Sequence, residues 1–413
     1  MNSKLKLVPA LLRWFAQNAR DLPWRRTRDP YAIWVSEIML QQTQVKTVLP
    51  YWERWMRELA TVQAAANTSP DKIHKLWEGL GYYTRVRNLQ KAARQIMKKH
   101  HGKIPDNFDD VLALPGIGRY TAGAICSIAF NQPTPILDGN VIRVLTRVFG
   151  IPENPREKKT NAYLWQLAEE LVGRAVPCPP RRGGDTAPYH SFLNQSLMEL
   201  GALVCTPRQP QCPVCPVKKL CVAFREDRVG ELPNLGRRTA STARHFMAFV
   251  VERQGRFLVR QRPAGVVNAH LWEFPNVEIA PNQRGSPAER DESAHYSCKK
   301  SQSRLTPAAT VQEPDLEIIR AAKSLGIEQA TLQPLCTVKH SITRYRIMLE
   351  AFHVHFGGRS STTPHLEFFG CRGTPPSEAG NVWFPLSKLN SLAFTAAHKK
   401  ILTHLKHDGR HLR

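Results

Sequence analysis

The sequence is poor in acidic side chains and contains no long apolar run. Its 413 residues include 58 Lys and Arg against 34 Asp and Glu, a formal net charge of +24. Because such a charge attracts polyanions, and no segment is apolar for long enough to span a bilayer, nucleic acid is a better candidate partner than a membrane. Charge alone still allows a basic protein that is merely soluble.

The first residues also lack the features of a secretory signal. Arg13 interrupts their short apolar run, and no small-residue cleavage site follows. We therefore expect an intracellular protein, in a bacterial cytoplasm and associated with the nucleoid. Nine cysteines in a reducing compartment are not expected to form a disulfide framework, and four of them lie within one short stretch, which indicates a metal site.

The chain divides by pattern into a helical part and a mixed part. Residues 30–55 repeat apolar side chains at three- and four-residue spacings, as a helix does, and residues 106–114 and 119–130 predict two more helices that meet at the turn LPGIG. We predict a helical domain over 1–225, a linker over 226–243 and an α+β domain over 244–405.

The second domain contains three β-type runs. Residues 245–253 and 256–263 form two of them, joined across Gln254 and Gly255, and 336–356 reads as one long third run. Between them, about 281–313, the chain is rich in Ser, Gln, Arg and Pro, and we interpret this segment as a flexible insertion.

The clustered cysteines have the spacing C-x6-C-x2-C-x5-C, at Cys205, Cys212, Cys215 and Cys221. Zinc sites usually contain two close pairs separated by a longer gap, whereas here one pair is flanked by two single cysteines. Four thiolates in one loop suit a compact iron-sulfur core, so we favour iron-sulfur over zinc.

Two carboxylates stand in unusual contexts. Glu37 lies among apolar residues of a predicted helix, where desolvation would keep it protonated near neutral pH, although a solvent-facing Glu is the commoner case. Asp138 begins the next helical run, where it would cap the helix and stay ionised. The turn LPGIG could hold a phosphate on its backbone amides, but alone it is only a turn.

The order of these motifs resembles one family. LPWR, SEIMLQQTQV, GLGYYTRVRNL, LPGIGRYT, LDGN and the cysteine loop follow one another, between about Leu22 and Cys221, as in MutY-type adenine DNA glycosylases. The resemblance implies an all-α helix-hairpin-helix glycosylase domain with a [4Fe-4S] cluster loop at 205–221, followed by an α+β Nudix-like domain. It implies a monomer that binds double-stranded DNA and removes adenine mispaired with 8-oxoguanine or guanine.

The resemblance also assigns roles to single residues. Glu37 would be the general acid for an adenine flipped out of the duplex, Asp138 would stabilise the oxocarbenium ion, and Asn140 would help to hold that site. Tyr120 stands where endonuclease III relatives have the lysine that forms a Schiff base, so strong lyase activity is not expected. A tyrosine there would instead hydrogen-bond the catalytic carboxylate.

Further contacts follow by the same resemblance. The expected DNA contacts are Gly116 and Gly118 of the hairpin, Gln42 and Tyr82 in the base stack, and Arg85 and Arg87 on phosphates. The expected adenine pocket consists of Trp24, Arg25 and Gln195.

The C-terminal domain lacks the paired glutamates of a hydrolytic Nudix enzyme between Phe274 and Leu325. By the resemblance it would recognise 8-oxoguanine without hydrolysis, through Ile342, Thr343 and Arg344. Arg344 departs from the histidine usual in the family, which puts discrimination against guanine in doubt.

Two other functions are compatible with parts of the sequence. An endonuclease III-type remover of oxidised pyrimidines is disfavoured by Tyr120 and by the second domain. A non-catalytic iron-sulfur DNA-binding protein is disfavoured by the presence of both Glu37 and Asp138.

Overall fold

A computed structural model describes the following residues of the chain: 3–173, 189–236, 240–279, 316–328, 330–342, 344–356 and 381–408. The chain forms two compact units, Met1–Arg238 and Thr239–Arg413. No helix within the described ranges has the length and apolar character needed to cross a bilayer.

The first unit is helical throughout its described residues, as predicted. Its elements are α1 (Ser3–Asn18), η1 (Pro23–Arg25), α2 (Pro30–Leu40), α3 (Val45–Glu58), α4 (Val62–Asn67), α5 (Pro70–Trp77), α6 (Thr84–Lys99), α7 (Phe108–Leu112), α8 (Arg119–Phe130), α9 (Gly139–Phe149), α10 (Lys158–Val172), α11 (Tyr189–Leu203), η2 (Cys212–Val214), η3 (Lys218–Leu220) and α12 (Val222–Arg225).

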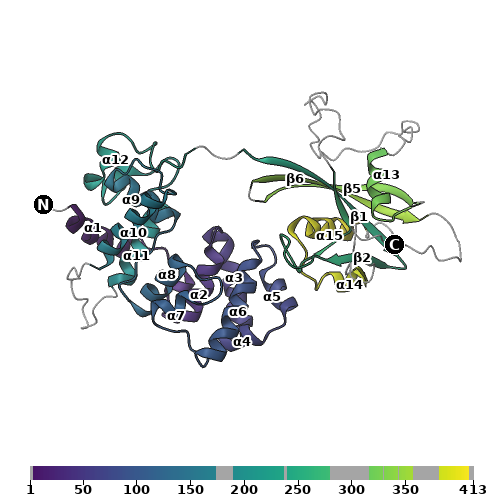
Figure 1. Ribbon diagram of the computed structural model, residues 1–413, viewed down its shortest axis with the longest axis horizontal. Coiled ribbons are helices and arrows are strands. Elements are labelled where there is room, and N and C mark those ends of the chain that lie inside the picture. Colours follow the sequence, from purple (N-terminus) through teal and green to yellow (C-terminus); the bar gives the residue numbers. More distant parts are fainter. Residues whose placement is uncertain are drawn as a thin grey trace. The chain divides into compact units, whose positions relative to one another are not determined.

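These helices form two groups (Figure 1). Helices α2 to α7 surround a core that includes Trp34, Trp55 and Trp77, each at most 1% exposed. Helix α1 packs instead against α11, far along the chain, and shares an aliphatic core with α9, α10 and α11. Helix α8 contacts both α2 and α11, so it connects the two groups.

One predicted helix is broken. The pattern over 30–55 reads as one helix, but α2 ends at Leu40 and α3 begins at Val45. Gln42 has a φ of 56°, a left-handed value that no helix interior tolerates, and the Thr43 amide closes a turn on the Leu40 carbonyl at 3.1 Å. The apolar period continues across this loop because both helices face the same core.

The predicted turn joins α7 to α8. Gly116 has a φ of 80°, which favours glycine, and a Cβ there would lie 2.5 Å from the Asn88 Cβ. Both the backbone conformation and the close contact therefore require glycine at this position. Gly118 is the N-cap of α8, and a Cβ built on it meets nothing within 4 Å. The two helices expected to meet at LPGIG are therefore confirmed.

The predicted linker over 226–243 is too long. Leu232 is buried, and its carbonyl accepts from Arg147 Nε at 2.8 Å. The Asn234 amide donates to the Pro152 carbonyl at 3.3 Å. Residues up to 236 thus belong to the helical unit, and the first strand of the second unit already begins at Thr242.

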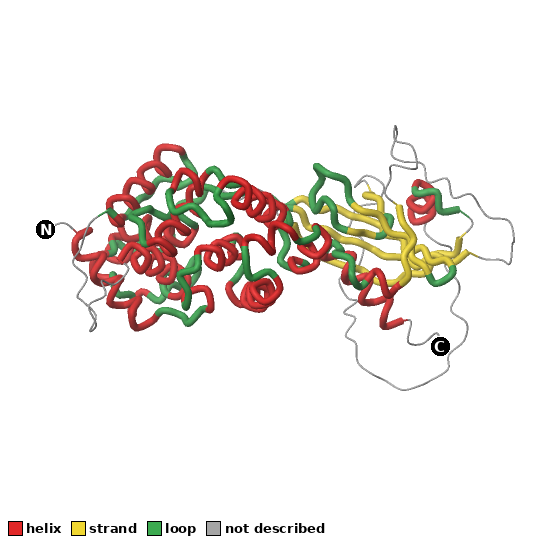
Figure 2. Tube along the Cα trace, turned by 90° about the horizontal axis from the view of Figure 1, so that it is seen from below, coloured by secondary structure: helices red, strands yellow, loops and turns green. Residues whose placement is uncertain are grey.

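The second unit is a mixed sheet with helices on both faces, the predicted α+β class. Its elements are β1 (Thr242–Arg253), β2 (Arg256–Gln261), β3 (Trp272–Glu273), β4 (Asn276–Ile279), α13 (Leu316–Ser324), β5 (Ala330–Ile342), β6 (Tyr345–Phe356), β7 (Asn381–Pro385), α14 (Leu386–Leu389) and α15 (Ala396–Asp408). The strand order is β3-β2-β1-β6-β5, with β1 and β6 parallel. Helices α14 and α15 share a core with one face, and α13 with the other; Figure 2 shows the strands between these helices.

The hairpin across Gln254 and Gly255 is confirmed by the pairing of Arg253 with Arg256. The single long run over 336–356 is wrong: it is an antiparallel hairpin of β5 and β6, in which Ile342 pairs with Tyr345. Both strands have high β propensity and a similar alternation of apolar and polar residues, so this pattern does not reveal the turn between them. The expected insertion over about 281–313 lies outside the described residues.

Candidate functional site

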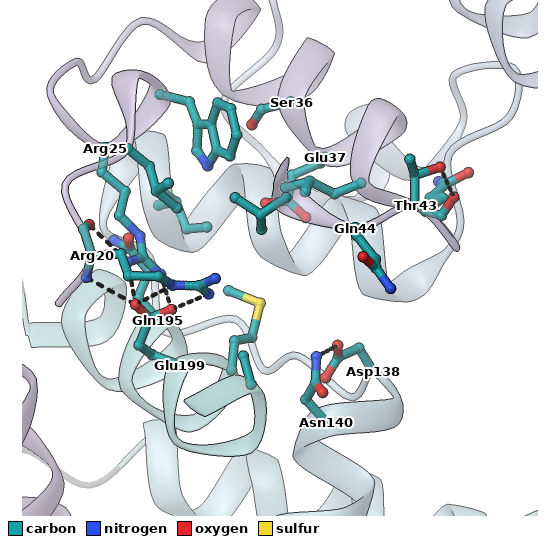
Figure 3. A pocket seen from close by; sticks show the side chains of 18 of the residues that line it. Arg20, Arg25, Ser36, Glu37, Thr43, Gln44, Asp138, Asn140, Gln195 and Glu199 are labelled. Carbon is teal, nitrogen blue, oxygen red and sulfur yellow. Dashed lines mark hydrogen bonds and ion pairs between the residues drawn. The ribbon is translucent and has the colours of Figure 1, made fainter. Parts of the chain in front are cut away.

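A cavity of about 860 Å³ opens in the helical unit between α2, α8, α9 and α11. All the residues predicted to be catalytic or to form the adenine pocket line it, together with Gln42, which was predicted as a DNA contact: Trp24, Arg25, Glu37, Tyr120, Asp138, Asn140 and Gln195. These residues come from positions up to 171 apart in the sequence and from five different elements. Figure 3 shows Glu37 on one wall and Asp138 with Asn140 on another.

Glu37 is a buried carboxyl group, only 5% exposed, on the wall formed by α2. Its pKa is raised to about 7: burial is the main cause, the hydrogen bond from Tyr120 opposes it, and the nearby charges of Asp138 and Arg25 act in opposite directions, upward and downward. A carboxyl group with a pKa near 7 is half protonated at neutral pH, which suits a general acid. The desolvation expected from its apolar neighbours is confirmed.

Tyr120 contacts Glu37 directly. Its hydroxyl donates to Glu37 Oε2 at 2.8 Å and lies 3.3 Å from the Met198 sulfur. Burial raises the pKa of Tyr120 well above its ordinary value, so the phenol keeps its proton and acts as a donor. The structure therefore contains a hydrogen bond from Tyr120 to Glu37, and the catalytic role of that carboxyl group stays a prediction.

Asp138 caps helix α9, as predicted. Its Oδ1 accepts from the Val141 amide at 2.8 Å, and its Oδ2 accepts from Asn140 Nδ2 at 2.9 Å. Burial nevertheless raises the pKa of Asp138, and the hydrogen bonds from Val141 and Asn140 oppose that rise. That Asp138 is ionised stays a prediction.

The far wall of the cavity contains an ion cluster that the sequence did not predict. Glu199 is fully buried on α11 and accepts hydrogen bonds from both Arg20 and Arg25, at 2.7 to 3.0 Å. These two guanidinium groups lower the pKa of Glu199 to about 2. Glu199 stands among apolar residues of a helix, the same signal that identified Glu37, and could have been found by it.

The other two predicted pocket residues are held in place by neighbours. The Trp24 ring is buried and packs edge-on against the Trp52 ring, with centroids 5.8 Å apart. Gln195 Nε2 donates to Ser191 Oγ at 3.0 Å. Together with Arg25 they place an aromatic face, an amide and a cation around the same cavity.

The four cysteines of the loop line one small cavity beneath α9 and α11. Among the described residues no three His, Cys, Asp or Glu side chains are placed to hold a single metal ion. The four thiols that line one space are the side chains that would hold an iron-sulfur core. Arg147 Nη1 lies 3.4 Å from Cys205 Sγ, where a guanidinium would offset thiolate charge.

One arginine connects this loop to the larger cavity. Arg143 Nε donates to the Cys205 carbonyl at 2.6 Å, and Arg143 Nη2 donates to Asn140 Oδ1 at 2.8 Å. Asn140 in turn donates to Asp138. The position of the Asp138 carboxyl group therefore depends on the cysteine loop through two side chains.

A second cavity, of about 210 Å³, brings together Gln42, Tyr82, Arg85 and Gly116. Tyr82 is 45% exposed, as a side chain that enters a base stack would be. Gly118 is exposed but does not line this cavity. Arg87 is half-buried and donates to Thr84 Oγ1 at 2.9 Å, and its phosphate contact stays a prediction.

The phosphate contact expected of Arg85 stays a prediction. Its guanidinium turns inward and donates to backbone carbonyls at the end of α2 and in the loops that follow α2 and precede α6: Ile38, Met39, Gln41, Leu80 and Gly81. Its Nε is buried without a hydrogen-bond partner.

In the second unit, Ile342 ends β5 and Arg344 precedes β6, at the tip of their hairpin. Ile342 is half-buried, and Arg344 is exposed, with Nη2 3.1 Å from the Tyr345 hydroxyl. Thr343, the third residue expected to read the lesion, lies outside the described residues.

Comparison with known proteins agrees with both units. The family described as HhH-GPD superfamily base excision DNA repair protein matches residues 35–170, and a NUDIX domain matches 247–404. The adenine DNA glycosylase of Rattus norvegicus is 40% identical over 324 residues, 66% of this chain and 60% of that protein. That of Buchnera aphidicola subsp. Schizaphis graminum is 35% identical over 271 residues, 65% of this chain and 74% of that protein.

The chain spans 58% to 61% of the length of the mammalian relatives that it matches. Among solved structures, a thermostable thymine-DNA glycosylase is 30% identical, with a TM-score of 0.48, over 54% of this chain and 97% of that one.

Proposed function

This chain belongs to the adenine DNA glycosylase family, and from that premise we propose that it hydrolyses the N-glycosidic bond of adenine mispaired with 8-oxoguanine or guanine in double-stranded DNA. The product is an abasic site. The observation that supports the proposal most is the buried Glu37, with a pKa of about 7, in the same cavity as Asp138.

Base release needs a proton and a counter-charge. Glu37 gives its proton to N7 of the flipped adenine, so that the bonding electron pair leaves with a neutral base. The sugar then becomes an oxocarbenium ion, and the carboxylate of Asp138 stabilises its positive charge until water adds at C1′. Asn140 fixes one Asp138 oxygen through the 2.9 Å hydrogen bond.

We propose that the enzyme is monofunctional. Tyr120 has no amine, and the hydroxyl is engaged with Glu37 Oε2. A lysine at this position would attack the sugar and lead to strand cleavage. Here the abasic strand stays intact until alkali or another enzyme cuts it.

We propose a [4Fe-4S] cluster on Cys205, Cys212, Cys215 and Cys221, since the four thiols line one cavity. When bound, the cluster would cross-link the loop after α11 to the start of α12. The Arg143 contacts would then transmit the fixed position of Cys205 to Asn140.

We propose that the second unit recognises 8-oxoguanine through the tip of the β5–β6 hairpin. Ile342 supplies an apolar contact, Thr343 a hydroxyl, and the exposed Arg344 a cation in place of the family's histidine. A cation there would also contact phosphate, so we expect weaker discrimination against guanine than a histidine would give. The protein would act as a monomer.

The proposal is tested with labelled duplexes that contain one A opposite 8-oxoguanine, A opposite G, A opposite T, or thymine glycol. We expect cleavage of the adenine strand of the first two, only after alkali treatment. Cleavage at thymine glycol without alkali would instead indicate an endonuclease III-type enzyme. Tight binding with no abasic product would indicate a non-catalytic DNA-binding protein.

A further inference from the structure

Among the described residues of the helical unit, Arg85 is the cation with the most hydrogen bonds that the proposed chemistry does not use. Its Nη1 donates to three carbonyls at the end of α2, those of Ile38, Met39 and Gln41, at 3.0, 2.9 and 2.5 Å. Its Nη2 donates to the carbonyls of Leu80 and Gly81, at 3.2 and 3.0 Å, and to Thr43 Oγ1 at 3.3 Å. One side chain therefore joins the loop after α2 to the loop before α6.

Each of these loops presents one residue in a strained conformation. Gln42 and Tyr82 have φ values of 56° and 49°, in the left-handed region that non-glycine residues rarely adopt. Both residues line the 210 Å³ cavity, and Arg85 stands between them, with its guanidinium 5.5 Å from the centroid of the Tyr82 ring. Strain of this kind persists only where the surroundings hold it, and the carbonyls bonded by Arg85 flank both strained residues.

The same helix also supports the hairpin. Asn88, one turn after Arg85 on α6, is the side chain against which Gly116 packs most closely. The first two turns of α6 thus contact all three segments expected to face DNA: the Gln42 loop, the Tyr82 loop and the glycine turn. The three segments form one surface because α6 connects them.

We propose that Arg85 is a positioning residue: it holds Gln42 and Tyr82 at a fixed separation so that the pair enters the base stack together and extrudes the adenine. This inference rests on the proposed function. It adds a role to that function: Arg85 prepares base flipping, whereas other residues bind phosphate or break the glycosidic bond. Arginine is required because only a planar fork can donate to both loops at once, whereas a lysine ammonium is a single point of charge.

The experiment compares Arg85→Lys with the matched control Arg94→Lys on the same helix. Arg94 Nε also donates to a backbone carbonyl, that of Ala66 at 3.1 Å, but Arg94 lines neither cavity. Three quantities are measured for each: the single-turnover rate at saturating enzyme, the salt dependence of duplex binding, and the fluorescence of 2-aminopurine placed opposite 8-oxoguanine. The fluorescence is read in a Glu37→Gln background, in which the base stays attached. It is expressed per molecule that binds duplex and is measured well below the melting temperature.

We expect Arg85→Lys to lower the single-turnover rate roughly 10- to 100-fold, as loss of reactant positioning does. The fluorescence increase that reports unstacking should fall in parallel, while the slope of log K against log[salt] stays that of the wild type. Arg94→Lys should leave all three unchanged. A merely destabilising change would lower the melting temperature without lowering the fluorescence per molecule that binds duplex.

Two results would overturn the proposal. A salt slope reduced by about one, with the saturated rate retained, would mean that Arg85 contacts a phosphate after all. Equal behaviour of Arg85→Lys and Arg94→Lys would mean that the fork positions nothing. Failure of the proposed function is separate, because the wild-type protein itself would then release no adenine.

Discussion

Replacement of Tyr120 by phenylalanine tests how the acid is tuned. The change removes only the hydroxyl that donates to Glu37 Oε2 at 2.8 Å and leaves the ring in place. That hydrogen bond stabilises the ionised form of Glu37, because it lowers the pKa that burial raises. Without it the carboxyl group should keep its proton to a higher pH.

The size of the effect follows from the strength of the bond. A hydrogen bond to a charged group is worth about 1.5 to 3 kcal/mol, and one pKa unit corresponds to about 1.4 kcal/mol. Since the wild-type pKa is about 7, loss of the bond should move it to about 8 to 9. A general acid works when protonated, so activity is present below the pKa and is lost as the pH rises through it.

The assay is the single-turnover rate of adenine release at saturating enzyme, measured from pH 5 to 10. We expect the alkaline limb of the profile to move upward by one to two pH units in Tyr120→Phe, with similar rates near pH 6. Tyr163→Phe, at an exposed tyrosine of α10, is the matched control and should not move it. An alkaline limb that stays in place, or moves to lower pH, would refute the assignment of Glu37 as an acid tuned by this phenol.

Three further predictions concern single side chains. Glu37→Gln should abolish base release while duplex binding survives. The pKa of Glu37 is about 7 in the folded protein against an ordinary 4.5, so the wild type should lose about 3 kcal/mol of unfolding free energy between pH 4.5 and pH 8. Urea unfolding should show no such loss in the variant, which has no carboxyl group at this position. Cys212→Ser should lower the iron and sulfide content of the purified protein, and a variant with full content would exclude this ligand. Glu199→Gln should cost about 1.5 to 3 kcal/mol of unfolding free energy at pH 7, because it removes the buried anion that two partly exposed guanidinium groups bond; an unchanged urea midpoint would contradict this.

The sequence was informative where a polar residue interrupts an apolar period. Glu37 in WVSEIML and Asp138 in ILDGN could be placed in a buried helix and at a helix start from their neighbours alone, and both lie in one cavity. The raised pKa of Asp138 could not be predicted in the same way. Helix capping is a local interaction, but the burial of Asp138, which raises its pKa, comes from elements that fold over it.

Contacts between distant segments were missed for the same reason. The ion-pair partners Glu199 and Arg25 are 174 positions apart, and the sequence around either residue does not indicate which residue is its partner. Arg85 looked like a phosphate contact because an arginine in a basic, exposed pattern usually is one. Only the structure shows that the end of α2 and the loop before α6 bring their carbonyls to it.

The glycine turn and Glu37, the proposed catalytic acid, are connected by the geometry of one helix. Gly118 caps α8, and Tyr120 is its second residue, so the turn fixes the direction in which the phenol leaves the helix axis. Each residue of an α-helix rotates about 100° about that axis. Insertion or deletion of one residue between Gly118 and Tyr120 would therefore turn the hydroxyl away from Glu37, even if the turn still held a phosphate. The first turn of α8 would bind DNA, and it also places the Tyr120 hydroxyl that donates to Glu37 Oε2. The spacing between the glycines and the tyrosine in GIGRY would therefore be required for the proposed acid chemistry as well as for DNA binding.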